Sequence, residues 1–321
     1  MPASIVTVTL NPAIDHTVHV DRFEPGAVNR ACGSHRQSAG KGINVATMLA
    51  IGGESGVLAA GFLGQENAAL YEQHFESHGI EDACVRVAGE TRTCIKIVDS
   101  NTGVTTDLNL SGLSPTPAQC EVLLQQLLEL AEPERWFVIS GSLPVAVEAS
   151  FVADMIGSLR AKGARVAIDS SGPTLAAAIK VGVDLAKPNQ HELAELLDRD
   201  LQGAESTLAA ARELCPQQIP TLIVSMGEAG ALFLSGDSTL MARASVTSVV
   251  STVGAGDALL AGYLQAQQRG ASFEESARLA AVYAWSRLES LVPKLPQGET
   301  LYERLQRVEL TSVSTLPEDT E

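Results

Sequence analysis

From about Trp136 to Val224 the chain alternates short, apolar, β-prone runs with helical patterns. The β-prone runs are Trp136–Ile139, Val166–Asp169, Asp184–Ala186 and Thr221–Val224. Helical patterns lie near Ala146–Lys162 and Leu175–Val181, and two more precede Thr221. Such alternation is typical of βαβ units, whose parallel strands are covered by helices on both faces. It predicts an α/β fold with a parallel sheet between two helical layers.

Two regions break this rhythm, at 15–35 and 92–110, where β-prone residues continue without an amphipathic helix. They predict antiparallel strands outside the main sheet. Because Asp15, Lys41 and Arg92 lie beside them, we expect a small β lid over the mouth of the α/β unit, able to exclude water. The 321 residues, 45% of them hydrophobic, then form one domain, 1–321, that includes the lid.

The net charge of −16 argues against binding to nucleic acid or to an anionic membrane surface, since both require a field of Lys and Arg. The N-terminus has no basic region followed by a long apolar one. The five cysteines show neither disulfide nor zinc-site spacing. We therefore expect a cytoplasmic protein whose ligands, if phosphorylated, are bound by a few local cations.

The segment Ser251–Ala258 carries the strongest chemical signal. The β-branched residues before it predict an extended run, and a helical pattern begins at Ala258, so its glycines are expected at a strand-to-helix junction. The N–H groups of Gly254, Ala255 and Gly256 would then be unpaired donors that a phosphate can approach. Asp257 beside such a site could take a proton from an attacking hydroxyl, or it could only interact with the helix dipole.

A second glycine-containing turn, Gly40-Lys41-Gly42, precedes a predicted helix. It is no Walker A loop, because Lys41 is followed by glycine rather than Ser or Thr. It can still hold an anion or a sugar. Asn44, one turn into the helix, could bind hydroxyls, or it could make a cap-type bond to the backbone.

Further polar candidates follow predicted strands. Asp15 could accept hydrogen bonds from vicinal hydroxyls or could be a turn former. Arg92 and Lys96 are four residues apart in a predicted strand, where their shared face suits a phosphate, although charges also protect edge strands.

Lys187 and Asn189 follow another predicted strand, with Glu192 three residues after Asn189. Glu192 could be a capping-box carboxylate or could hold Mg²⁺ through water. Lys187 would then contact nucleotide phosphates. Ser225 and Gly227 end the next strand with small residues, against which a base or ribose can lie; alone they indicate only a turn.

In order, these motifs resemble the ribokinase-like (PfkB) carbohydrate kinase family over nearly the whole chain. The resemblance rests on Ala-Gly-Lys-Gly-Ile-Asn at 39–44, Lys-Pro-Asn-x-x-Glu at 187–192 and Thr-Val-Gly-Ala-Gly-Asp at 252–257. It implies an ATP-dependent, Mg²⁺-assisted kinase with a β lid that in several members also forms a homodimer clasp. The chain departs from the family pattern at 280–287, where bulky residues replace small ones and an amide near the adenine.

The resemblance also assigns roles. Asp257 would be the catalytic base, with an anion hole made by Gly254, Ala255 and Gly256. The nucleotide side would comprise Lys187, Asn189, Ser225, Gly227 and Thr252, with Glu192 for magnesium. The sugar-phosphate side would comprise Asp15, Gly40, Lys41, Asn44, Arg92 and Ser140.

Within the family, the chain resembles the branch that phosphorylates the 6-hydroxyl of fructose 1-phosphate. This finer resemblance rests on residues 9–15, 38–46 and 107–112. Tagatose 6-phosphate and fructose 6-phosphate are alternative substrates for the same machinery. A catalytically silent sugar-phosphate sensor is the non-enzymatic alternative.

Overall fold

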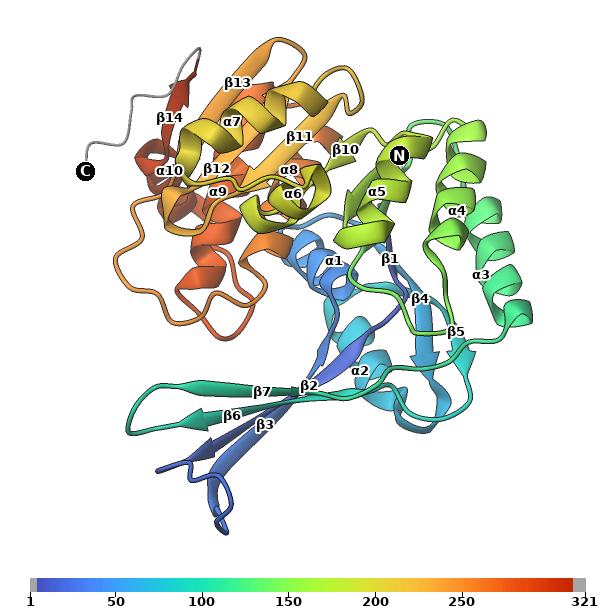
Figure 1. Ribbon diagram of the computed structural model, residues 1–321, viewed down its shortest axis with the longest axis vertical. Helices are drawn as coiled ribbons and strands as arrows, with labels where there is room; N and C mark the ends of the chain where they lie inside the picture. Colours follow the sequence, from blue (N-terminus) through green and yellow to red (C-terminus); the bar gives the residue numbers. More distant parts are fainter. Residues whose placement is uncertain (1–4, 314–321) are drawn as a thin grey trace.

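The computed structural model describes residues 5–313 and contains one large and one small sheet (Figure 1). In order across the large sheet, the strands are β14 (Glu309–Ser312), β13 (Ser238–Arg243), β12 (Ala231–Ser235), β11 (Thr221–Ser225), β10 (Leu185–Ala186), β9 (Arg165–Asp169), β8 (Trp136–Ser140), β1 (Val6–Thr9), β4 (Leu58–Gly64) and β5 (Glu81–Val87). Every neighbouring pair from β11 to β5 is parallel, whereas β12, β13 and β14 add an antiparallel end.

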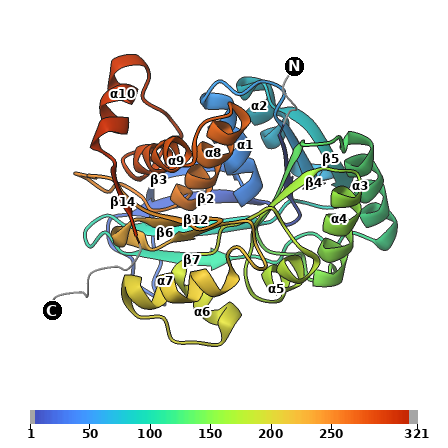
Figure 2. The same ribbon diagram turned by 90° about the horizontal axis from the view of Figure 1, so that it is seen from above.

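Helices cover both faces of the large sheet (Figure 2). One layer consists of α1 (Lys41–Ile51), α2 (Ala69–His78), α8 (Ala255–Gln268), α9 (Phe273–Leu288) and α10 (Gly298–Arg307). The other consists of α3 (Pro117–Leu130), α4 (Ala149–Ala161), α5 (Gly172–Val181), α6 (Gln190–Leu197) and α7 (Gly203–Leu214). No helix of the described chain is long and apolar enough to cross a membrane.

The central strands are apolar on both sides because each face packs against a helical layer. In β8, Phe137 and Ile139 join the core cluster under α3–α7, whereas Trp136 and Val138 join the cluster under α1, α2, α8 and α9. Successive side chains of a strand point to opposite faces, so an all-apolar run fills both cores. The predicted α/β architecture with helices on both faces is confirmed.

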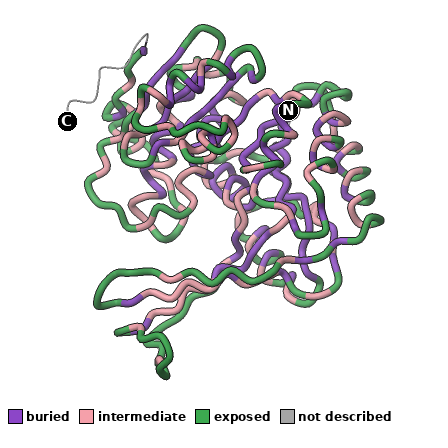
Figure 3. The backbone as a smooth tube through the Cα atoms, viewed as in Figure 1, coloured by how far each residue is buried: buried purple, intermediate pink, exposed green. Residues whose placement is uncertain are grey.

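The small sheet has the order β3 (Ala31–Ala39), β2 (Ala13–Val20), β6 (Thr93–Asp99) and β7 (Thr105–Asn109). It projects from the body at the lower left of Figure 1, and much of it is exposed in Figure 3. The predicted antiparallel strands are present as the pairs β2–β3 and β6–β7, but β2 and β6 join these pairs in parallel, which was not predicted. Both strands leave the body beside each other, since Ile14 N donates to Arg92 O at 2.7 Å.

The prediction of a strand directly before the glycine-rich segment is wrong. β13 ends at Arg243, and no strand or helix lies between it and α8. The edge of β13 that such a strand would need is already paired with β14. Val249 and Val250 are consequently exposed, and the glycines lie at a loop-to-helix junction.

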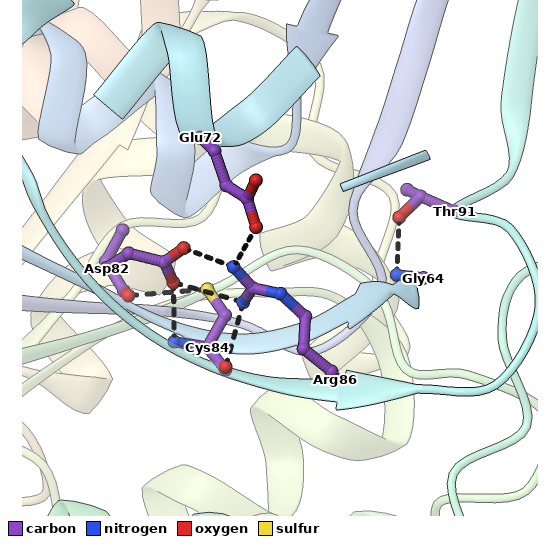
Figure 4. Close-up of polar contacts among 7 residues, drawn as sticks. Gly64, Glu72, Asp82, Cys84, Arg86 and Thr91 are labelled. Atoms are coloured by element: carbon purple, nitrogen blue, oxygen red, sulfur yellow. Dashed lines mark hydrogen bonds and ion pairs between the residues drawn. The ribbon is translucent and has the colours of Figure 1, made fainter. Parts of the chain in front are cut away.

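At the opposite edge of the large sheet, charged groups tie β5 to α2 (Figure 4). Arg86 Nη2 lies 2.8 Å from Glu72 and 2.5 Å from Asp82. Such a cluster makes an edge strand a poor template for pairing with another chain. Figure 4 also shows Thr91 Oγ1 accepting from Gly64 N at 2.8 Å, which fixes the chain entering β6 beside the end of β4.

The contact between α8 and α9 depends on a glycine. A Cβ at Gly262 would lie 2.8 Å from Leu279 O and 2.9 Å from Ala280 Cα, both backbone atoms of α9. We expect Gly262→Ala to destabilise the protein by about 1–3 kcal/mol through overpacking. The matched control is Gly157→Ala in α4, where a Cβ would meet only Val181 Cγ1 at 3.6 Å.

The control should stabilise the protein by up to about 1 kcal/mol, because alanine suits a helix better than glycine. Urea denaturation of both variants measures the difference. Equal midpoints would show that the two helices can separate without loss of stability.

Candidate active site

The N-terminus of α8 forms the centre of the site. Gly254 is its N-cap, with φ +78°, a left-handed conformation that favours glycine. Ala255 N donates to Thr252 O at 3.3 Å, so this N–H is not unpaired, contrary to the prediction. Within residues 5–313, the N–H groups of Gly254 and Gly256 have no protein acceptor. Together with the helix dipole, these two donors can bind an anion.

Asp257 lies in the first turn of α8 and is only 6% exposed. Its Oδ2 accepts a hydrogen bond from Asn44 Nδ2 at 2.7 Å, which brings two predicted site residues 213 positions apart into contact. Asn44 therefore does not make the alternative backbone cap. Burial, and then the charge of Asp169, raise the pKa of Asp257 to about 6. At neutral pH the carboxylate is largely ionised and can accept a proton.

Asp169 is a site residue that the sequence analysis missed. It ends β9 and is fully buried, with Lys41 Nζ 2.9 Å from Oδ1 and Lys187 Nζ 3.0 Å from Oδ2. Burial opposes the charged form, but the two lysines prevail and lower the pKa of Asp169. The pairing also raises the pKa of Lys41 in spite of its burial. The sequence signal that could have identified Asp169 is its place at the carboxyl end of a predicted parallel strand, where ligand sites form.

Lys187 and Lys41 bring the nucleotide-side and sugar-side candidates together. A Cβ at Gly256 would lie 3.3 Å from Lys187 Nζ, so the ammonium borders the α8 turn. Glu192 Oε1 lies 3.7 Å from Lys41 Nζ. Glu192 Oε2 accepts from Asn189 N at 2.9 Å, and Asn189 Oδ1 accepts from Glu192 N at 2.8 Å. The capping box is therefore present, and one Glu192 oxygen stays outside it.

A cavity of about 630 Å³ adjoins the α8 turn and is large enough for a nucleotide. Its lining includes the predicted nucleotide-side residues Ser225, Gly227 and Thr252 together with Ala255 and Gly256. Asn189 is not in the lining but forms a parallel bridge with Ser225. Trp285 also lines the cavity, within the segment that departs from the family pattern.

The sugar-side candidates lie where the small sheet meets the body. Asp15 belongs to β2 rather than to a turn, and its Oδ2 is 2.6 Å from Lys96 Nζ. Arg92 precedes β6 and donates to the carbonyls of Asn11 and Pro12, both at 3.3 Å. The edge-strand alternative is wrong, because β6 lies between β2 and β7.

Ser140 and Gly40 complete this side. Ser140 ends β8 and is 3% exposed, yet its Oγ has no hydrogen-bond partner within the described chain. Such a buried hydroxyl is an available donor for a ligand. Gly40 has φ +140°, and a Cβ there would lie 2.9 Å from Thr9 Cγ2, so only glycine allows α1 to begin this close to β1.

The described residues contain no group of three or more His, Cys, Asp and Glu side chains suited to hold a metal ion. Mg²⁺ keeps several waters and is bound through one or two carboxylates and substrate phosphates. Glu192, with one carboxylate oxygen outside its capping bond, fits such an ion.

The chain matches a known protein family over most of its length. The model of the pfkB family carbohydrate kinases matches residues 8–290. The chain belongs to this family. It is 42% identical over 318 residues to a 1-phosphofructokinase of Rhodobacter capsulatus, with 99% of each chain covered. It is 42% identical over 295 residues to a 1-phosphofructokinase of Xanthomonas campestris, covering 90% of this chain and 92% of that one.

Among solved structures, phosphofructokinase-2 from Escherichia coli in complex with fructose-6-phosphate matches with a TM-score of 0.87 and 26% identity. The match covers 95% of this chain and 98% of that chain. The predicted family, its fold and its phosphotransferase class are thus confirmed. Kinases of this family use ATP.

The pKa of Asp257 predicts the pH dependence of catalysis. The acid limb of kcat/KM should have an apparent pKa of about 6. Asp169→Asn removes the negative charge that raises this pKa, so the limb should move to lower pH. A pH series of initial rates on both proteins measures the shift, and an unmoved or upward-shifted limb would exclude Asp257 as the titrating base.

Proposed function

We propose that the protein transfers the γ-phosphoryl group of MgATP to the 6-hydroxyl of D-fructose 1-phosphate, giving fructose 1,6-bisphosphate and ADP. The predicted 1-phosphofructokinase function has the support of relatives that are 35–42% identical over 90–99% of this chain. The observation that carries the chemistry is the buried Asp257 carboxylate beside the free N–H groups at the start of α8.

In the proposed step, the 6-hydroxyl oxygen attacks the γ-phosphorus while its proton passes to Asp257. The bond from the γ-phosphorus to the bridging oxygen breaks, and ADP leaves with the electron pair. Asn44 holds Asp257 in place through the 2.7 Å hydrogen bond. Gly254, Ala255 and Gly256 would surround the transferring group, where positioning and fixed dipoles provide most of the catalysis.

The cations beside this turn are assigned to the phosphates. Lys187, next to Gly256, would contact the nucleotide phosphates, and Asn189, Ser225, Gly227 and Thr252 would complete the nucleotide side. Glu192 would hold Mg²⁺ through water, and that ion, when bound, neutralises charge on the phosphoryl oxygens. Asp169 keeps both lysines in place.

The sugar phosphate would lie between the α8 turn and the small sheet. Asp15 and the free Ser140 Oγ offer partners for sugar hydroxyls, and Gly40, Lys41 and Asn44 border the same space. Arg92 is the cation we assign to the 1-phosphate, because Lys96 is already paired with Asp15. The small sheet would act as a lid on a single kinase domain.

Two further properties stay predictions. The exposed strands β3 and β7 at the two edges of the small sheet could pair with a second copy to form a homodimer, which light scattering would detect. The second is the cytoplasmic location expected from the sequence.

The proposed substrate is tested by ADP release from MgATP with fructose 1-phosphate, fructose 6-phosphate and tagatose 6-phosphate in parallel. We expect the highest kcat/KM with fructose 1-phosphate. Preference for a 6-phosphate would reject the substrate and the role of Arg92 but retain Asp257 as base. Binding of a sugar phosphate without turnover would instead support the sensor.

Asp257→Asn tests the base. Loss of the proton acceptor should lower kcat by roughly 10²–10⁴-fold with little change in KM. The pKa of Asp257 in the folded protein, about 6, exceeds the usual 3.8, so the ionised carboxylate destabilises the fold. This destabilisation is complete above pH 6 and absent at pH values far below 3.8. The variant should therefore have an equal or higher melting temperature at pH 7.5.

That gain should nearly disappear towards pH 3.5, where Asp257 is protonated in the folded parent and mostly protonated in the unfolded parent. Initial rates and thermal melts at the two pH values measure the effects. A variant with nearly normal kcat, or with lower kcat only because it melts early, would contradict the assignment.

A further inference from the structure

Arg287, near the C-terminal end of α9, is a buried cation that the proposed chemistry does not yet use. Arg287 is only 7% exposed, and such burial is rare for arginine. Its Nη1 donates to the carbonyl oxygens of Ser290 and, at 3.0 Å, Leu291. The guanidinium therefore ties the loop after α9 to the interior.

The other side of the guanidinium faces the α8 turn. A Cβ at Gly254 would lie 3.2 Å from Arg287 Nε and 3.8 Å from Asn44 Nδ2. The residue that holds Asp257 and the buried arginine thus border the same glycine. Within the described chain, the hydrogen bonds of the guanidinium all come from Nη1, so Nε, which borders Gly254, has no acceptor there.

The position brings a buried cation close to other positive charge, which the carboxylates of Asp257 and Asp15 offset only in part. The start of α8 carries the positive end of the helix dipole, and Lys187 already borders Gly256. Burial lowers the pKa of Arg287, against the favourable charges of Asp257 and Asp15. An arginine stays protonated under these conditions, so a permanent positive charge is kept beside the turn.

We propose that Arg287 is a positioning residue for phosphoryl transfer, which holds the Gly254 turn against the 290–291 loop and adds a fixed positive charge at the end of the turn opposite Lys187. This inference rests on the proposed function, because its effect is exerted on Asp257 and on the transferring phosphoryl group. Fixed charges that need no reorganisation during reaction stabilise the developing negative charge most effectively.

The test compares Arg287→Met and Arg287→Lys with Arg278→Met. Arg278 is a matched control on the same helix, since its Nη1 also donates to two backbone carbonyls, those of Leu305 and Val308, away from the α8 turn. Loss of a structural hydrogen bond alone should change kcat equally in Arg287→Met and Arg278→Met. Loss of a positioning charge should lower kcat only in Arg287→Met.

We expect Arg287→Met to lower kcat by roughly 10²-fold with little change in KM for fructose 1-phosphate. Arg287→Lys should recover part of kcat, and Arg278→Met should keep it. Guanidinium chloride, well below denaturing concentrations, should partly rescue Arg287→Met relative to choline chloride at equal ionic strength. Thermal melts of all variants identify any that are unfolded at the assay temperature.

The pH profile provides a readout that a structural role would not move. The charged groups that act on Asp257 are Asp169 from β9, Lys41 from α1, Lys187 after β10 and Arg287 from α9. Removing the positive charge of Arg287 should raise the acid limb of kcat/KM, and Arg287→Lys should restore it.

The outcomes separate the two proposals. If the parent does not phosphorylate fructose 1-phosphate, the proposed function fails. If the parent is active and Arg287→Met retains its kcat and acid limb, or loses kcat only in step with Arg278→Met, the inference about Arg287 is rejected. A loss of kcat that occurs in Arg287→Met but not in Arg278→Met, and that guanidinium partly rescues, supports the inference.

Discussion

The site depends on one ion triad around a buried carboxylate. Asp169 is fully buried at the end of β9, and its two oxygens hold Lys41 and Lys187. Burial of a single unpaired charge would cost several kcal/mol, so the carboxylate and the lysines require one another. The same carboxylate raises the pKa of Asp257. In the proposed function, one residue of the central sheet thus positions the cations assigned to the phosphates and raises the pKa of the carboxylate assigned as the base.

The topology explains why these groups converge. α1 begins directly after β3, and α8 packs against α1, so the N-termini of both helices reach the same edge of the sheet as the carboxyl ends of β8, β9 and β10. Asn44 from α1 can then touch Asp257 from α8. The small sheet leaves the body at this edge too, through Pro12 and Arg92. Ligand sites at the carboxyl ends of parallel strands are a general consequence of this architecture.

Local sequence patterns predicted most of the fold. The apolar alternation gave the βαβ region, and the Asn189 to Glu192 spacing gave a capping box that the structure contains. The errors arose where distant segments decide. The run near Val249 is no strand because β14, from the end of the chain, occupies the edge of β13. The position of Asp169 at the end of a strand can be seen in the sequence, but its pairing with two lysines cannot. That pairing and the position of Arg287 depend on contacts between remote elements.

In the proposed function, local charge rather than the charge of the whole protein binds the phosphates. A chain of net charge −16 repels polyanions at a distance, but screening limits that repulsion to about 8 Å at physiological ionic strength. Inside the site, Lys187 and Arg287 are both under 10% exposed and border the two glycines of one turn. Their fields are screened much less, since little solvent separates them from the turn. In the proposed function, the net negative charge therefore affects how fast phosphorylated substrates arrive, whereas a few buried cations hold them.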